Sequence, residues 1–210
     1  MNFFSSSADR AMAWEELQDK VKDCTRCDLS SSRKNTVFGE GSRHSPLVLV
    51  GEGPGSDEDG QGKPFIGKAG RLLTQILASV GIAREDVFIT NVVKCRPPGN
   101  REPVPDEMMA CSVFLETQLA LLRPKILITL GNTPTKWLLR TSEGITSLRG
   151  RWIPWRGILL FPMFHPSYLL RNESRRKGSP KDLTWQDMKA LREKIEELGL
   201  VLQGGKEKEP

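Results

Sequence analysis

Four short apolar runs stand out from the mixed polar pattern of this chain, and each predicts a buried β-strand. They cover residues 47–50, 87–93, 126–130 and 158–161. Branched apolar residues follow one another in these runs and do not alternate with polar ones. This pattern is typical of strands in a parallel sheet that is covered on both faces.

Helical patterns separate the predicted strands. They predict helices over residues 9–22, 71–80, 105–122, 133–140 and 183–198. Gly81 and Gly199 are typical of helix C-terminal ends, and Pro105 is typical of a helix start. Because helices and strands alternate, we expect an α/β fold: a three-layer α/β/α sandwich with a central, mainly parallel four-stranded sheet. We expect one domain over residues 1–203 and a flexible C-terminal tail over residues 204–210.

Composition and charge narrow the class of protein. The chain has 210 residues, and no apolar run approaches the roughly 20 residues of a membrane span. The first ten residues lack the pattern of a secretory leader, so we expect a cytoplasmic protein without a membrane partner. Residues 149–181 hold eight Lys or Arg and one acid, with Trp152, Trp155 and Tyr168 among them. This segment suits a polyanion, although a solvated basic face explains it equally well.

A polar residue follows or ends each predicted strand. These residues are Glu52, Asn91, Asn132 and His165. Ligands of open α/β sheets bind beyond the carboxyl ends of the strands. We therefore expect these four side chains to meet at one edge of the sheet and to form a site.

The segment GEGPGSDEDGQGKPFIGKAG, residues 51–70, follows the first predicted strand. A glycine-rich loop in this place suggests a phosphate-binding loop in a nucleotide-binding enzyme. However, Asp57, Glu58 and Asp59 oppose a phosphate, and the Gly-Lys-Ser/Thr ending of a P-loop is absent from the segment. The sequence therefore points away from a phosphate ligand here.

The chain has four cysteines, with Cys24 and Cys27 close together and Cys95 and Cys111 far from them. In a cytoplasmic protein, four cysteines indicate a metal site or catalysis more than disulfide bonds. The second pair lacks the tight spacing of a zinc knuckle, and a spread of two, one and one is compatible with an iron–sulfur cluster. Burial of the cysteines as small apolar residues is the alternative.

Three motifs together with the Cys24–Cys27 spacing resemble the family 4 uracil-DNA glycosylases, the iron–sulfur members of the uracil-DNA glycosylase superfamily. The motifs are GEGPGSDEDGQGKPFIGKAG, TNVVKCRPPGNR and FHPSYLLRN, and the resemblance runs from about Cys24 to Asn172. It implies an enzyme that flips uracil out of DNA and hydrolyses the N-glycosidic bond in base excision repair. Uracil-containing DNA, single- or double-stranded, is the implied partner, and we expect a monomer.

The resemblance also implies roles for individual residues around the flipped base. Glu52 and Gly53 would lie beside the glycosidic bond, and Phe65 would stack on the base. Asn91 would pair with the uracil edge, and His165 would face uracil O2. Other members carry an aspartate where this chain has Gly53, so the sequence leaves open whether Glu52 activates the attacking water.

Further roles follow from the same resemblance. Glu58 would crowd the position that a thymine methyl group needs. Leu169 and Leu170 would wedge into the gap that the flipped base leaves. DNA phosphates would be held by Arg171, Arg175 and Arg176. A [4Fe–4S] cluster would be held by Cys24, Cys27, Cys95 and Cys111.

Two alternatives remain at this point. One branch of the superfamily binds uracil-DNA covalently through a histidine in an extra loop, but residues 146–157, TSLRGRWIPWRG, contain no histidine. We therefore expect ordinary turnover. The other alternative is a non-catalytic four-cysteine metal module that binds DNA. The second histidine, His44, precedes the first strand, and we expect it at the surface.

Overall fold

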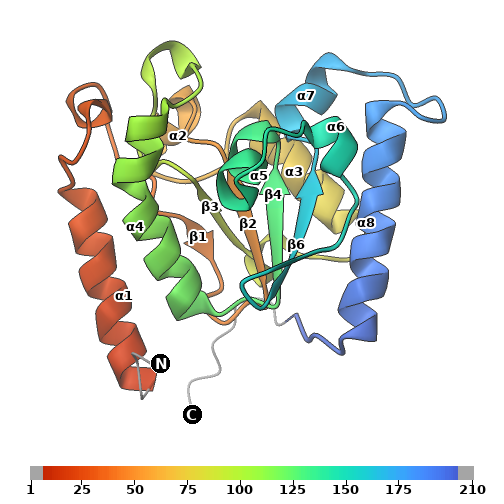
Figure 1. The fold of residues 1–210 in the computed structure, drawn as a ribbon, viewed down its shortest axis with the longest axis horizontal. Helices are drawn as coiled ribbons and strands as arrows, with labels where there is room; N and C mark the ends of the chain where they lie inside the picture. The colour runs from red at the N-terminus through yellow and green to blue at the C-terminus, as the bar shows by residue number, and fades with distance from the viewer. Residues whose placement is uncertain (1–6, 203–210) are drawn as a thin grey trace.

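The computed structural model describes residues 7–202, which form a central sheet between two layers of helices (Figure 1). The predicted three-layer α/β/α sandwich is therefore confirmed. The expected tail over residues 204–210 lies outside the described residues.

The described sheet has six strands in the order β1-β3-β2-β4-β6-β5. The central four strands, β3, β2, β4 and β6, run parallel, and the two edge strands are antiparallel to their neighbours. The prediction of a mainly parallel sheet is confirmed, but the prediction of four strands is wrong. The strands are β1 (Glu40–Gly41), β2 (Leu47–Gly51), β3 (Phe88–Asn91), β4 (Ile126–Leu130), β5 (Ile153–Trp155) and β6 (Ile158–Met163).

Both edge strands escaped prediction for local reasons. β1 has two residues and no apolar run. β5 contains Pro154, which is tolerated because the strand lies at the sheet edge. It joins β6 through Arg156 and Gly157, which have φ values of 47° and 80°. Two positive φ values in a two-residue loop are typical of a type I′ hairpin turn.

The ends of two central strands also differ from prediction. β3 ends at Asn91, two residues early, because its partner β2 ends at Gly51. β6 continues past Phe161 through Pro162 to Met163. Pro162 lies opposite Thr129 of β4 and beyond the last residue paired with β5, so on that side no strand requires its missing N–H.

The described helices agree with the predicted ones within a few residues, and the structure adds three short helices that were not predicted. The longer helices are α1 (Ser7–Lys22), α3 (Lys68–Ala78), α4 (Pro105–Leu122), α5 (Asn132–Leu139) and α8 (Pro180–Glu197). The short ones are α2 (Ser56–Gln61), α6 (Ile145–Leu148) and α7 (Pro166–Arg171). Three single 3-10 turns complete the list: η1 (Asp28–Ser31), η2 (Arg84–Asp86) and η3 (Pro98–Asn100).

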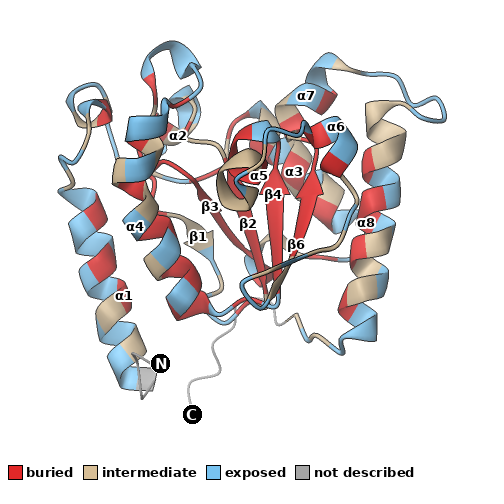
Figure 2. Ribbon diagram, viewed as in Figure 1, coloured by how far each residue is buried: buried red, intermediate tan, exposed pale blue. Residues whose placement is uncertain are grey.

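The hydrophobic core lies on both faces of the sheet. In β2, Val48 and Val50 face a cluster with α1, α4 and α5, whereas Leu47 and Leu49 face a cluster with α3 and α8. Figure 2 shows the central strands buried, while each long helix buries one side only. The continuous apolar runs of the sequence are thus explained, because each central strand is covered from both sides.

Loops follow the carboxyl ends of the central strands. Glu52, Asn91, Asn132 and His165 lie at these strand ends or in the segments that follow them. His44 is exposed in the turn before β2, as expected. Among the described residues, no helix combines the length and apolarity needed to cross a membrane.

Candidate active site

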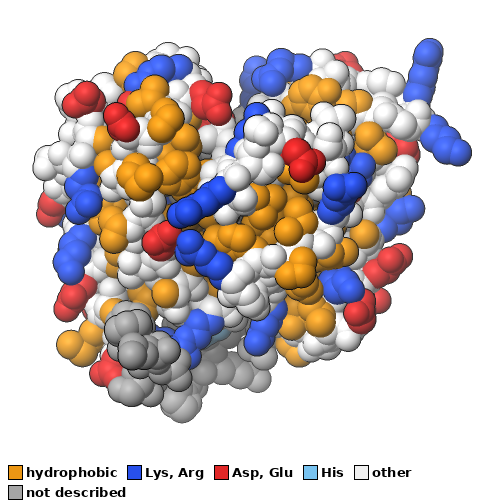
Figure 3. Space-filling model, in the orientation of Figure 1, with side chains coloured by type: hydrophobic (Ala, Val, Ile, Leu, Met, Phe, Trp, Pro, Cys, Tyr) orange, Lys and Arg blue, Asp and Glu red, His pale blue; other side chains and the backbone are white. Residues whose placement is uncertain are grey.

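A cleft of about 700 Å³ opens at the carboxyl ends of the parallel strands. Its walls come from the loop after β2, the loop between β3 and α4, the start of α5, and α7. Figure 3 shows this end of the molecule hollowed between the segment that precedes α4 and α7. The four residues expected at one edge of the sheet, Glu52, Asn91, Asn132 and His165, all line the cleft. The sequence-based expectation that they meet is confirmed.

Phe65 and Asn91 line the cleft, and both pack against Gly51. A Cβ atom on Gly51 would lie 2.4 Å from Asn91 Oδ1 and 2.6 Å from the Phe65 ring, so only glycine fits there. Phe65 is 7% exposed and has a φ of 51°. The Phe65 backbone also requires glycine at position 70. A Cβ atom on Gly70 would lie only 1.8 Å from the Phe65 carbonyl oxygen. The two glycines therefore allow a strained phenylalanine to hold its ring beside Asn91.

Asn91 is 1% exposed, and its Oδ1 atom has no hydrogen-bond partner among the described residues. An unpaired buried carbonyl costs free energy, so such an atom in a cleft indicates a ligand that donates to it. The Asn91 backbone is fixed by Lys94, whose buried Nζ donates to the Asn91 carbonyl oxygen at 2.8 Å. The acceptor is thus held in place before a ligand arrives.

His165 caps α7, and its contacts decide where its proton lies. The Ser167 backbone N–H donates to His165 Nδ1 at 3.1 Å, so Nδ1 is an acceptor and the hydrogen is on Nε2. Burial, followed by the nearby charge of Arg171, lowers the pKa of His165 to about 4. The ring is therefore neutral at pH 7 and carries one N–H donor. The Phe65 and His165 ring centroids lie 5.7 Å apart.

Glu52 is half-buried and contacts a second carboxylate through one hydroxyl group. Thr133 Oγ1 lies 2.5 Å from Glu52 Oε2 and 2.8 Å from Glu102 Oε1. Burial raises the pKa of Glu52, the Thr133 hydrogen bond opposes this shift, and the charge of Glu102 adds to it. Glu102 and Thr133 were not predicted, because no motif marks them in the sequence.

The acids of the loop after β2 hold the loop itself. Glu58 Oε1 accepts from the backbone N–H groups of Ile66 and Gly67, both at 3.0 Å, and Oε2 accepts from Gly55 at 3.1 Å. Asp59 is 2% exposed and accepts from the Lys34 backbone N–H at 2.8 Å. Both lie in α2, where acids favour the helix N-terminus. Glu58 lines the cleft, but with three donors bound it serves first to shape the loop.

Gly53 lines the cleft and packs against the Val93 side chain. A Cβ atom on Gly53 would lie 2.7 Å from Val93 Cγ2, so a larger residue requires Val93 to move. Packing therefore accounts for glycine at this position, independently of any catalytic role.

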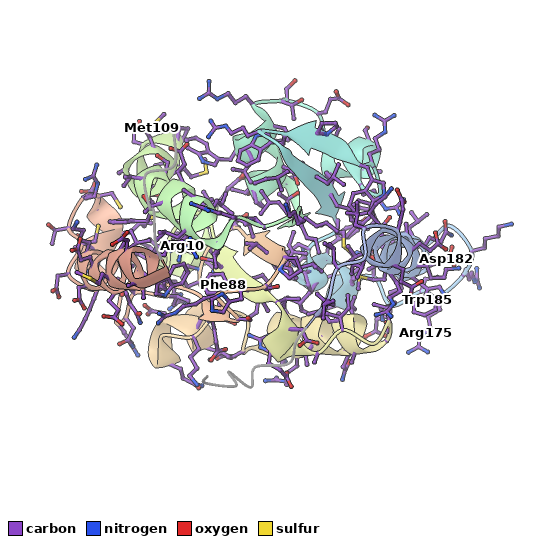
Figure 4. The ribbon with its side chains drawn as sticks, turned by 90° about the horizontal axis from the view of Figure 1, so that it is seen from below. Arg10, Phe88, Met109, Arg175, Asp182 and Trp185 are labelled. Atoms are coloured by element: carbon purple, nitrogen blue, oxygen red, sulfur yellow. The ribbon has the colours of Figure 1, made fainter. Side chains whose placement is uncertain are left out.

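The residues expected to contact DNA differ in exposure. Leu169 is 2% exposed and packs against Ile145 and Phe164, so the prediction that it wedges into DNA is corrected: it anchors α7. Leu170 is 39% exposed and remains available. Arg171, Arg175 and Arg176 are exposed, and none forms an ion pair with a described residue. Figure 4, a view from below, shows Arg175 at the edge of the molecule.

The four cysteines come from three parts of the chain and line one small cavity beside α1 and α4. Cys95 and Cys111 are buried, and Cys24 and Cys27 are partly buried. Arg33 Nη1 donates to Cys95 Sγ at 3.2 Å, and the Lys94 backbone N–H donates to Cys111 Sγ at 3.3 Å. Burial raises the pKa of the Cys111 thiol to about 11.

Two cations lie near this cysteine cavity, and they differ in their contacts. Arg33 Nη1 donates to Cys95, whereas Lys94 Nζ donates to Thr90, Asn91 and Gln118. Both cations line the cavity, and Lys94 is fully buried. A cation beside a thiol favours the ionised thiolate, and Arg33 acts on Cys95 in this way. Within residues 7–202, no group of three or more His, Cys, Asp or Glu side chains converges as one metal ion would require. The cysteines therefore surround a space without meeting at a point.

Comparisons with known proteins agree with this arrangement. A family model described as the uracil DNA glycosylase superfamily matches residues 38–189. A type-4 uracil-DNA glycosylase of Thermotoga maritima is 49% identical over 162 residues, which cover 76% of this chain and 84% of that protein. A type-4 uracil-DNA glycosylase of Saccharolobus solfataricus is 45% identical over 175 residues, or 79% and 81% of the two chains. A type-5 uracil-DNA glycosylase of Pyrobaculum aerophilum is 26% identical over 195 residues, or 77% and 86%.

Proposed function

Because this chain belongs to the uracil-DNA glycosylase superfamily, we propose that it is a DNA glycosylase that flips uracil out of DNA and hydrolyses its N-glycosidic bond. It leaves an abasic site for base excision repair. The observation that carries this proposal is the buried Oδ1 of Asn91, which has no partner among the described residues and lines the cleft.

Asn91 reads the Watson–Crick edge of the base. Uracil presents an N3–H donor, which satisfies Asn91 Oδ1, and an O4 acceptor, which the carboxamide N–H₂ serves. Cytosine presents the opposite pattern and leaves buried polar groups unpaired. Mismatches of this kind discriminate between substrates by several orders of magnitude. Phe65, held beside Asn91, supplies the stacking face.

His165 stabilises the negative charge that develops on the departing uracil. As the C1′–N1 bond breaks, uracil becomes an anion and the sugar becomes positively charged. The Nε2–H of neutral His165 donates to uracil O2, since Nδ1 is already an acceptor for Ser167. A fixed donor of this kind contributes roughly 3–4 kcal/mol to the transition state. Glu52, which also lines the cleft, stabilises the sugar cation.

The four cysteines hold a [4Fe–4S] cluster in this proposal. The cavity between them and the Arg33 guanidinium beside Cys95 fit an anionic cluster of thiolates and iron better than a single ion. When bound, the cluster would supply structure: Cys95 and Cys111 flank residues 96–110, and Pro97, Asn100, Arg101 and Glu102 of this segment line the cleft. Iron and sulfide analysis tests this assignment, and zinc without iron would contradict it.

Uracil-containing DNA, single- or double-stranded, approaches the cleft across α7. Leu170 is exposed there, and Arg171, Arg175 and Arg176 supply positive charge for the phosphates. We also propose that the enzyme works in the cytoplasm, as a monomer.

The test is an incubation of the protein with an oligonucleotide that carries one uracil, followed by alkali, which cleaves the strand at abasic sites. Scission at the uracil position supports the proposal, and an otherwise identical thymine oligonucleotide should stay intact. A denaturation-resistant adduct would instead support the covalent branch. Retained DNA binding without scission or adduct would support a non-catalytic module and contradict the proposal.

A further inference from the structure

Three oxygen atoms from three separate segments meet at the wall of the cleft. They are Glu52 Oε2 after β2, Thr133 Oγ1 in the first turn of α5, and Glu102 Oε1 in the loop before α4. Both oxygen–oxygen distances, 2.5 Å and 2.8 Å, are hydrogen-bond distances. All three residues line the cleft.

The number of hydrogen atoms decides the charge of this group. Two hydrogen bonds between three oxygens require two hydrogens, but the Thr133 hydroxyl has only one. Two ionised carboxylates supply none. Both contacts are full hydrogen bonds only when one of the carboxyl groups carries a proton, and the pair then has one negative charge instead of two. Two carboxylates that share a site commonly hold one proton in this way.

We propose that Glu102 is a positioning residue that shares one proton with Glu52 through the Thr133 hydroxyl, so that Glu52 becomes ionised when the sugar becomes positively charged. This inference rests on the proposed function. Glu52 is the more buried of the two carboxyl groups, so the proton lies mainly on Glu52 before the reaction. Because the pair carries one negative charge instead of two, it repels incoming DNA phosphates less.

The proton moves without leaving the group. The Glu52 Oε2–H bond breaks as Thr133 Oγ1 gains that hydrogen, and the original Thr133 hydrogen passes to Glu102 Oε1. Glu52 gains the negative charge that Glu102 loses, and the total number of protons is unchanged. After the transfer, the negative charge is on Glu52. Glu52 contacts Thr133 in the first turn of α5, where the helix dipole favours a negative charge.

The other charged side chains that line the cleft have partners of their own or are exposed. Arg101, next to Glu102, is paired with Glu107 through Nη1–Oε2 at 2.9 Å and Nη2–Oε1 at 2.6 Å. Glu58 is held by three backbone donors, and His165 is neutral. The other charged side chain that lines the cleft is Arg171, which is exposed.

The first test compares the pH dependence of single-turnover uracil excision in four variants of the full chain. Glu102→Gln keeps hydrogen bonding but cannot share the proton, so the acidic limb of the profile should move to lower pH by about one unit. Thr133→Val keeps the shape without the hydroxyl and should slow excision about tenfold. Thr133→Ser should recover the wild-type limb, and Glu143→Gln, an exposed glutamate outside the cleft, is the control.

The second test does not depend on activity. In DNA-free protein with carbon-13 at the glutamate δ position, NMR should show Glu52 titrating in two steps. The Glu102→Gln variant should leave Glu52 with a single step at lower pH. A single, unshifted Glu52 titration that Glu102→Gln does not move would overturn the inference. Coupled titration without uracil excision would instead contradict the proposed function and leave the shared proton standing.

Discussion

At the residue scale, His165 shows how local contacts choose one chemical form of a side chain. A histidine near neutral pH exists in three forms, and only a neutral ring with hydrogen on Nε2 donates into the cleft without bringing a charge. The Ser167 N–H selects this tautomer, and burial excludes the protonated form. The same residue therefore makes two predictions, one for activity and one for stability.

Replacing His165 by alanine should reduce the single-turnover rate of uracil excision at least about 100-fold, because a donor to the leaving anion is lost. His44→Ala is the matched control, since His44 is an exposed histidine away from the cleft, and it should excise uracil at the wild-type rate. Equal rates for the two variants would remove His165 from the mechanism.

His165 should also make the free energy of unfolding depend on pH. Its pKa is about 4 in the folded protein and 6.5 ordinarily. Between these values the unfolded chain binds a proton that the folded chain does not, so stability falls as pH drops from about 6.5 to about 4. We expect a loss of about 2 kcal/mol, less than the full shift implies because the ring is partly exposed. Urea unfolding at several pH values measures this loss. In His165→Gln, the fall in unfolding free energy that is due to His165 should be absent.

At the element scale, the segment that leads into β5 is tied to α8 by one buried ion pair. Arg149 contacts Asp187 through both a short Nη2–Oδ1 bond and an Nε–Oδ2 bond of 2.9 Å. Asp187 is 2% exposed, and a Cβ on Gly150 would lie 2.5 Å from its carboxylate. The pair thus fixes how the chain turns from α6 into the β5–β6 hairpin.

Asp187→Ala should lower the free energy of unfolding by about 3 kcal/mol, because it leaves the Arg149 charge buried without its partner. Glu193→Ala, an exposed position on the same helix, should change it by less than about 0.5 kcal/mol. Chemical denaturation of both variants measures the difference. A loss no larger for Asp187→Ala than for Glu193→Ala would mean that apolar packing alone holds α8.

At the scale of the whole molecule, the sequence allows prediction of the elements that bury apolar surface and of the residues that follow them directly. Glu52, Asn91 and His165 could be placed together because each follows or ends a strand of one parallel sheet. The meeting of Glu102 with Thr133 could not be predicted, since it depends on the path of an irregular loop. Burial of individual α7 residues was equally out of reach, because a helix of one or two turns has too little periodicity to show which face is inside.

The distribution of charge over the molecule predicts how DNA binding responds to salt. Replacing Arg175 and Arg176 by alanine should reduce the slope of log affinity against log salt by about one for each lost phosphate contact. Lys125→Ala is a suitable control, because Lys125 is exposed just before β4, at the opposite end of the sheet from the cleft. Fluorescence anisotropy with a uracil oligonucleotide at several salt concentrations gives the slopes, and equal slopes for all proteins would exclude this surface as the DNA footprint.

The most direct test of the central claim is the single-turnover rate of uracil excision by the wild-type protein and by Asn91→Ala, measured on matched oligonucleotides that carry uracil, thymine or cytosine. We expect the wild type to excise uracil and to leave thymine and cytosine in place. Asn91→Ala should lose at least about 100-fold of the uracil rate while its DNA affinity is retained. A wild-type protein that leaves uracil in place, or an Asn91→Ala variant that removes it at the wild-type rate, would contradict the account.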